Sequence, residues 1–260
     1  STNWAAMAYT SNPEGEARIL SRLADLQSRC DRQNRPCFLG FLDDFQRKVC
    51  QNALRKSALA YRFYGGYEDA ERVFLGLSPW EDSGLLDEDF PIRQVEAVFR
   101  HQDKPGHRDF LGAVLALSLK REAVGDILVE EGKARIYLTA PAADVVLTQL
   151  VQVGRIGVVC CEPLSWSTAT KRRFTEIEGS ISSLRLDCVV AFLGDLSRSG
   201  ASELIARGQV SIDGQPVGNG ARIVELKEKI SIRGTGKFIY DQQPGLSKKG
   251  KLRVRFLKYS

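Results

Sequence analysis

The stretch RLDCVVAFLGDLSRSGASELIARGQVSIDGQPV, residues 185–217, predicts two short helices joined by a tight turn. Apolar residues recur at helical spacing in the first helix: Leu186, Val189, Val190 and Leu193. Gly194 ends this helix. Ser197 and Ser199 flank the start of the second, where a hydroxyl oxygen can accept a backbone N–H that has no partner inside the helix. We therefore expect a compact helical pair here.

A strand follows the helical pair. The second helix has an apolar side formed by Ala201, Leu204 and Ile205, and Gly208 is placed to end it. The alternation of apolar and polar residues from Val210 to Gly214 predicts a strand that enters a turn at the glycine. The helices and the strand together predict a small α+β domain at this end of the chain.

The charge of the chain is unevenly distributed. The net charge is +5, but residues 180–260 hold 14 Lys and Arg against 7 Asp and Glu, whereas residues 1–179 hold 23 against 25. A positive field confined to the last third of the chain favours a polyanionic partner, whose phosphates Lys and Arg would neutralise. The charge alone is compatible with any polyanion.

The remaining composition is that of an ordinary soluble globular protein, with 43% hydrophobic and 27% charged residues. No run of about 18 apolar residues occurs, so we expect no membrane span, and the first residues do not read as a secretory signal. The 6 cysteines form no C-x-x-C pair, and only 2 histidines accompany them. We therefore expect reduced thiols, no metal site and no cofactor.

Three domains are predicted: residues 1–80, 81–176 and 177–260. The first is expected to be helical, because apolar stripes run from about residue 14 to 58, with Asp43 as a plausible N-cap. In the second, the predicted element order is βαββαβ, which is the ferredoxin-like order shared by RNA-recognition modules. Its third strand offers only Tyr137 as an aromatic platform, so base stacking on this sheet is not expected.

Other residues are candidates for secondary contacts with RNA or the ribosome. Arg62, Tyr64 and Tyr67 lie in a stretch where aromatic residues and arginines alternate, and either RNA contact or a packed aromatic loop explains it. For the remaining basic residues, phosphate contact and a solvated surface stay open as alternatives: Arg108, Lys120, Arg121, Lys171, Arg172 and Arg173.

The end of the chain combines cations with strands. Residues 251–259 place cations and apolar residues on alternate faces, so one face can pack while the other meets phosphate. A charged edge strand that prevents pairing is the alternative. The candidate RNA-binding cations of this region are Lys237, Lys248, Lys249, Lys251, Arg253 and Arg255.

Residues 184–240 resemble the alpha-L RNA-binding domain named after small-subunit ribosomal protein four. The segments that carry the resemblance are RLDCVVAFLG, SRSGA and LIARGQVSIDGQPV. Upstream, FYGGYEDAERVFL and HRDFLGAVLALSLKREAVGDILV resemble the YlmH-type proteins, which include a cyanobacterial and plastid branch called photosystem II S-four-domain proteins. This second resemblance extends from about Phe38 to the C-terminus.

The resemblance implies a non-catalytic protein, expected to be a monomer, that binds ribosomal RNA and tRNA on the large ribosomal subunit in ribosome-associated quality control. It implies a location in the cytoplasm, or in the chloroplast stroma after removal of a transit peptide, and photosystem II biogenesis is an alternative role. By position, the RNA-contacting residues of the family correspond to Arg185, Ser197, Arg198, Ser199, Arg207 and Gln209.

The rival class is an RNA-modifying enzyme, to which such a binding domain is often an accessory. The motifs that an enzyme would need do not support it. Arg185-Leu186-Asp187 lies inside the binding domain and not in a separate pseudouridine-synthase domain. The K-M-S-K-S loop of a tyrosyl-tRNA synthetase is absent, as is a G-x-G-x-x-G loop. His107-Arg108-Asp109 is not followed by the other kinase motifs.

Overall fold

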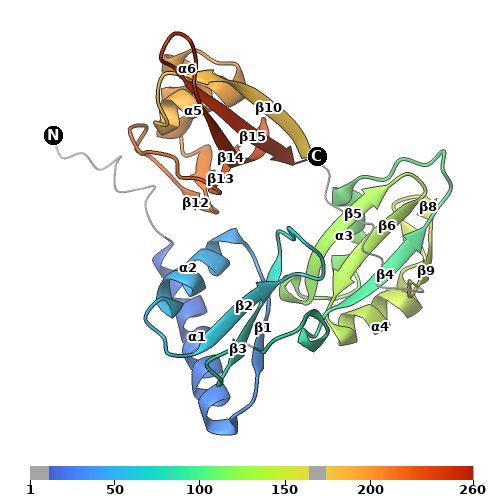
Figure 1. The fold of residues 1–260 in the computed structure, drawn as a ribbon. Helices are drawn as coiled ribbons and strands as arrows, with labels where there is room; N and C mark the ends of the chain where they lie inside the picture. The colour runs from blue at the N-terminus through green and yellow to red at the C-terminus, as the bar shows by residue number, and fades with distance from the viewer. Residues whose placement is uncertain (1–11, 83, 164–173, 260) are drawn as a thin grey trace. The chain divides into compact units, whose positions relative to one another are not determined.

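The computed structural model describes residues 12–82, 84–163 and 174–259, and the chain divides into two compact units (Figure 1). The described residues from 15 to 163 belong to one unit, and those from 174 onward belong to the other. Both units combine helices with antiparallel sheets, so the predicted α+β class is confirmed. Among the described residues, no helix is long and apolar enough to cross a membrane.

The first unit begins with a helix–sheet layer. Its elements are α1 (Pro13–Gln33), β1 (Cys37–Leu42), α2 (Asp44–Leu54), β2 (Ala60–Tyr64) and β3 (Val73–Ser78). The strands form an antiparallel sheet in the order β1-β3-β2, and a buried core joins it to α1 and α2. As predicted, Asp43 caps α2: its carboxylate accepts from Gln46 N at 2.8 Å, and the Gln46 side chain accepts from Asp43 N at 3.0 Å.

The prediction of a helical N-terminal domain over residues 1–80 is wrong, because three strands accompany the two helices. Cys37–Leu42 is an apolar run of 6 residues, and a run of this length does not reveal by its periodicity whether it is helix or strand. Val73–Ser78 is buried at every position, so it shows no alternation at all.

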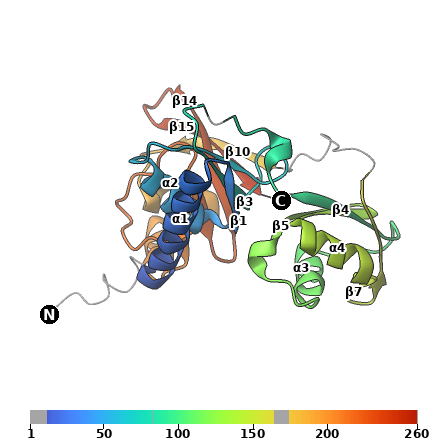
Figure 2. The same cartoon turned by 90° about the horizontal axis from the view of Figure 1, so that it is seen from below.

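The rest of the first unit has a second sheet. Its elements are the 3₁₀ turn η2 (Asp87–Asp89), β4 (Arg93–Val98), α3 (His107–Leu115), the 3₁₀ turn η3 (Arg121–Ala123), β5 (Val124–Glu130), β6 (Lys133–Leu138), α4 (Ala140–Gln149), β7 (Gln152–Val153), β8 (Ile156–Gly157) and β9 (Val159–Cys161). The main sheet has the strand order β5-β6-β4-β9, with every pair antiparallel. Helices α3 and α4 cover one face (Figure 2), where the apolar core lies.

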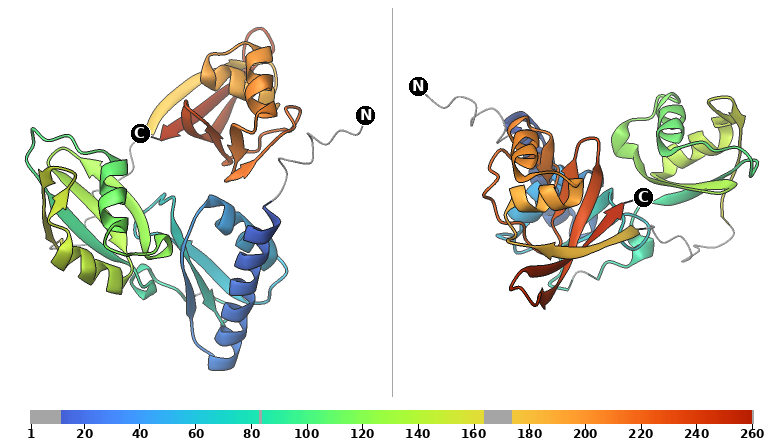
Figure 3. Two further views of the ribbon diagram at one scale, coloured as in Figure 1. Left: turned by 180° about the vertical axis from the view of Figure 1, so that it is seen from behind. Right: turned by 90° about the horizontal axis from the view of Figure 1, so that it is seen from above.

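The second unit contains residues 185–217, the predicted helical pair and the strand after it. Its elements are β10 (Phe174–Ile181), α5 (Leu186–Gly194), α6 (Arg198–Ala206), β11 (Val210–Ile212), β12 (Gln215–Pro216), β13 (Lys229–Ile232), β14 (Gly236–Leu246) and β15 (Leu252–Tyr259). The sheet order is β10-β15-β14-β13-β11-β12. Helices α5 and α6 lie together on the sheet (Figure 3) and share its core. Strand β15 lies between β10 and β14, so the edge-strand alternative does not hold.

The predicted helical pair is confirmed. Helix α5 begins after Arg185, and Ser197 caps α6 by accepting a hydrogen bond from Gly200 N at 3.1 Å. Gly208 follows α6 with a φ of 70°. Asp213 and Gly214 then have φ values of 47° and 78°, the two positive angles that a type I′ hairpin turn requires.

Candidate RNA-binding site

The start of α5 is attached to the loop before β13. Leu186 N donates to Arg222 O at 2.8 Å, and Asp187 N donates to Gly220 O at 3.0 Å. Arg185 also forms an antiparallel bridge with Ile223. These bonds satisfy the first backbone N–H groups of the helix, which would otherwise be available to an anion. An anion at this helix end would therefore have to be bound by side chains.

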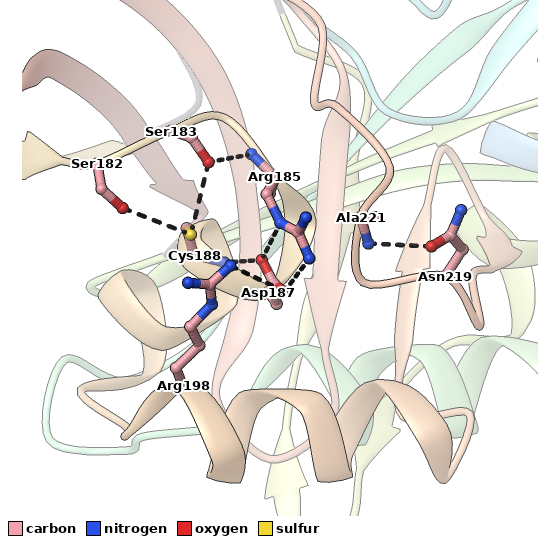
Figure 4. Close-up of polar contacts among 8 residues, drawn as sticks. All are labelled: Ser182, Ser183, Arg185, Asp187, Cys188, Arg198, Asn219 and Ala221. Carbon is pink, nitrogen blue, oxygen red and sulfur yellow. Dashed lines mark hydrogen bonds and ion pairs between the residues drawn. The ribbon is translucent and has the colours of Figure 1, made fainter.

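Two arginines converge on one buried carboxylate at this point (Figure 4). Arg185 Nε lies 3.2 Å from Asp187 Oδ1, and Arg185 Nη2 lies 2.8 Å from Oδ2. Arg198 Nη2, from the first residue of α6, lies 3.6 Å from the same Oδ2. The Asp187 side chain is 7% exposed, whereas those of Arg185 and Arg198 are 41% and 60% exposed. The carboxylate thus lies below the surface and the guanidinium groups above it.

Asp187 is held in its ionised form. The hydrogen bond from the Arg185 guanidinium is the main cause that lowers the pKa of Asp187 to about 2, and the Cys188 side chain and the charges of Arg185 and Arg198 act in the same direction against the effect of burial. The carboxylate therefore keeps its charge, and its hold on both arginines, at any neutral pH. Asp187 was not predicted as a site residue, although the spacing Arg185-x-Asp187 was the available signal.

The other predicted residues of the helical pair lie along α6. The Ser197 and Ser199 hydroxyl oxygens are 3.1 Å apart at its start, and both residues are exposed. Arg207 is exposed at the other end and forms an ion pair with Glu203 one turn earlier. Gln209 uses its backbone within the fold: its N–H donates to Leu204 O, and its carbonyl accepts from Arg233 N at 2.9 Å.

The hairpin between β14 and β15 contributes a second group of cations, which we call the basic hairpin: Lys248, Lys249, Lys251 and Arg253. All four residues are exposed. Within the described part of the chain, no carboxylate lies within ion-pair distance of any of them. Residues 180 and 181, which lead into α5, pair with Arg253 and Leu252. The basic hairpin therefore begins beside the end of β10, the strand that precedes Arg185.

Two further cations of this unit interact with the protein itself. Arg255 lies 3.5 Å from Glu176, 3.8 Å from Glu178 and 3.6 Å from Asp241. The Lys237 ammonium lies over the Tyr259 ring, 5.4 Å from its centroid. These side chains are less available to phosphate than those of the basic hairpin.

The aromatic stretch of the first unit packs against other residues of that unit, and Arg62, Tyr64 and Tyr67 are partly buried. Arg62 donates to Leu85 O at 3.0 Å, pairs with Asp87, and lies over the Tyr64 ring at 5.1 Å. The Tyr67 hydroxyl donates to the buried Asp126 carboxylate, and its ring lies 4.9 Å from that of Tyr137. Tyr137, the one aromatic residue of β6, is therefore covered and only 1% exposed.

The remaining secondary candidates occupy different environments. Arg121 donates to Val124 O at 2.7 Å, and burial, aided by the nearby charge of Arg72, lowers its pKa to about 10. Arg108 and Lys120 are exposed, at the start of α3 and just before η3. Lys171, Arg172 and Arg173 lie outside the described residues.

A metal centre was not expected. Within residues 12–82, 84–163 and 174–259, no group of three or more His, Cys, Asp or Glu side chains is arranged to hold a metal ion. The six cysteines have free thiols, three of them buried.

Comparisons with known proteins identify the class to which this architecture belongs. Residues 87–165 match the family described as "Putative RNA-binding domain in YlmH". A solved structure, the cell division protein ylmH from Streptococcus pneumoniae, is similar in fold, with a TM-score of 0.51, 22% identity, and coverage of 57% of this chain and 91% of that one.

One curated relative matches almost from end to end. The ribosome-associated protein quality control protein P2 of Bacillus subtilis is 32% identical over 246 residues, which is 93% of this chain and 94% of the relative. The chain belongs to the YlmH family of proteins, and the resemblance identified in the sequence is confirmed.

Proposed function

We propose that this protein is a non-catalytic factor that binds structured RNA of the ribosome, ribosomal RNA or tRNA on the large subunit, as part of translation quality control. In this proposal, residues 177–260 are the alpha-L RNA-binding domain and residues 81–176 a ferredoxin-like domain. The protein acts wherever such ribosomes occur, in the cytoplasm or the chloroplast stroma.

The observation that carries the proposal is the convergence of two exposed arginines on Asp187, in the unit that also contains the basic hairpin. Guanidinium groups bind phosphate oxygens with two parallel hydrogen bonds, and folded RNA is recognised largely through its backbone and shape. The name of the Bacillus subtilis relative, a ribosome-associated quality control protein, supports a ribosomal RNA as the target.

Replacement of Arg198 and Arg207 by Ala tests the proposal. Both side chains are more than half exposed, at 60% and 63%, so the fold should tolerate their loss. We expect ribosome co-sedimentation to fall by about tenfold or more, since each lost phosphate contact weakens binding.

The matched control removes the same charge from the first unit. Arg29 and Arg32 are exposed on α1, and both lie outside residues 87–165, the segment that matches the putative RNA-binding domain of the family. Their replacement by Ala should leave co-sedimentation unchanged. If the Arg198 and Arg207 variant co-sediments as the unaltered protein does, the proposed site is wrong.

A further inference from the structure

We propose that Arg185 and Arg198 form a clamp for a single RNA phosphodiester group and that Asp187 is the residue that positions this arginine clamp. The inference rests on the proposed RNA-binding function and adds to it the roles of individual groups. It makes a buried acidic residue necessary for binding a polyanion, which charge alone would not suggest.

Backbone donors at the start of α5 are already engaged. The N–H groups of Leu186 and Asp187 donate to Arg222 O and Gly220 O, and that of Cys188 donates to Asp187 Oδ1 at 2.8 Å. A phosphate that approaches this helix end therefore finds no free N–H on the first three residues. The available donors are those of the guanidinium groups, which extend outward from Asp187.

Each guanidinium group retains donors after it has bound Asp187. An arginine has five N–H donors. Arg185 directs its Nε and Nη2 toward Asp187, so the two N–H groups on Nη1 and one on Nη2 remain. Arg198 approaches Asp187 through Nη2 alone. A phosphate oxygen pair can therefore accept from both arginines while the carboxylate holds them from below.

The carboxylate also opposes the repulsion between the two cations. Arg185 immediately precedes α5 and Arg198 begins α6, and two like charges that approach the same carboxylate repel each other unless an anion lies between them. Asp187 supplies that anion and leaves a net charge of one for the phosphate. Because both side chains are ordered before RNA arrives, less conformational entropy is lost on binding.

The loop before β13 holds the Asp187 side chain in place. A Cβ added to Gly220 would lie 3.3 Å from the Asp187 Cβ, so the loop backbone packs directly against this side chain. Its backbone N–H is bonded to the same Gly220. The carboxylate therefore has a defined position from which it sets the two guanidinium planes.

The decisive variant is Asp187→Asn, which raises the net charge of the RNA-binding unit by one. A protein that bound RNA only through its overall field would bind more tightly after this change. The clamp predicts the opposite: affinity for purified bulk ribosomal RNA, measured by filter binding at fixed salt, should fall by about tenfold because charge-assisted bonds no longer orient the arginines.

Glu203→Gln is the matched control, since Glu203 pairs with Arg207 on the exposed side of α6 and its side chain is 59% exposed. Removal of this carboxylate should leave affinity equal or slightly higher. Arg185→Lys together with Arg198→Lys keeps both charges but removes the planar donors, and this variant should lose affinity as Asp187→Asn does.

A double-mutant cycle separates positioning from a merely structural role. In a background that carries Arg185→Ala and Arg198→Ala, the further change Asp187→Asn should cost no additional affinity. If the cost persists in that background, or if Asp187→Asn alone binds as tightly as the unaltered protein, the clamp is overturned. If the variant with Arg185→Ala and Arg198→Ala binds as the unaltered protein does, the clamp is likewise overturned. If the unaltered full-length protein does not bind ribosomal RNA at all, the proposed function itself fails.

Discussion

Gly66 is a residue at which a single methyl group should disturb the first unit. Its φ is +101°, and a Cβ built there would lie 2.4 Å from Tyr137 Cδ1 and 3.2 Å from Ile92 Cγ2. Tyr137 is buried beneath Tyr67, so it has little room to retreat. We expect Gly66→Ala to lower the free energy of unfolding by about 2–4 kcal/mol, measured by urea denaturation.

Gly112→Ala is the control for this substitution. Gly112 lies inside α3, where an added Cβ meets nothing within 4 Å. Ala is the better helix former, so this variant should be more stable by about 0.5–1 kcal/mol. Equal stability of the two variants would show that Tyr137 does not pack on Gly66 as described.

Asp187 should make the stability of the second unit depend on pH in the acid range. Its pKa is lowered from 3.8 to about 2 in the folded protein, so its contribution to stability is complete above the unfolded value and is lost as pH falls through this interval. The unfolding free-energy difference between the unaltered protein and Asp187→Asn should therefore shrink by about 1 kcal/mol between pH 4 and pH 2, after allowance for solvent screening.

Amide hydrogen exchange of residues 174–259, followed across this pH range in both proteins, provides the measurement. Other carboxylates titrate in both proteins alike and cancel in the comparison. A difference that stays constant with pH would mean that Arg185 does not stabilise the ionised carboxylate.

At the level of elements, the cations of β14, β15 and their turn differ in their environment. We expect those on the turn to be available to RNA and Arg255 of β15 not to be. Lys248 and Lys249 are exposed on the turn, whereas Arg255 faces three carboxylates. Replacement of both lysines by Ala should reduce the slope of log K against log salt for RNA binding by up to about two. Arg255→Gln should leave that slope unchanged, because the arginine is already neutralised.

Titration of RNA binding against salt for the two variants provides this test. The same reduction of slope in both variants would contradict the prediction that the turn lysines contact phosphates and Arg255 does not.

Elements with local signals could be predicted from the sequence, and this explains the success with α5 and α6. A capping hydroxyl at Ser197 and a terminating Gly208 act within a few residues of each other. Strand β1 lacked such a signal, because a short apolar run is equally compatible with helix and strand. Burial on both faces removed the alternation that would have marked β3.

The candidate site was predictable only in part, for a related reason. Charge and family position indicated Arg185, Arg198 and the basic hairpin, which the structure places in one unit. Hydrogen bonds and ion pairs between residues that are distant along the chain could not be predicted from the spacing of residues in the sequence. Asp126, which accepts from Tyr67, lies 59 residues further on, and the carboxylates around Arg255 come from neighbouring strands.

At the scale of the molecule, the charge asymmetry separates two kinds of surface. Several cations of the first unit are paired with nearby carboxylates, as with Arg93 and Asp144 at 2.8 Å and Arg135 and Glu96 at 3.1 Å. The basic hairpin and the arginine clamp belong to the residues that carry the excess positive charge, 14 Lys and Arg against 7 Asp and Glu. We therefore expect the second unit to supply most of the salt-dependent part of the RNA affinity.

This asymmetry predicts a steep dependence of RNA binding on salt. If four or more of the exposed cations contact phosphates, log K for ribosomal RNA should fall against log salt with a slope of about −4 or steeper, because each neutralised phosphate releases counterions. Equilibrium binding of the full-length protein at several potassium chloride concentrations measures this slope. The control in which Arg29 and Arg32 are replaced by Ala should give the same value, since those cations belong to the first unit and lie outside the segment that matches the putative RNA-binding domain. A slope between zero and about −1 would mean that at most one phosphate is contacted, and RNA recognition would then have to rest on uncharged donors such as Ser197 and Ser199.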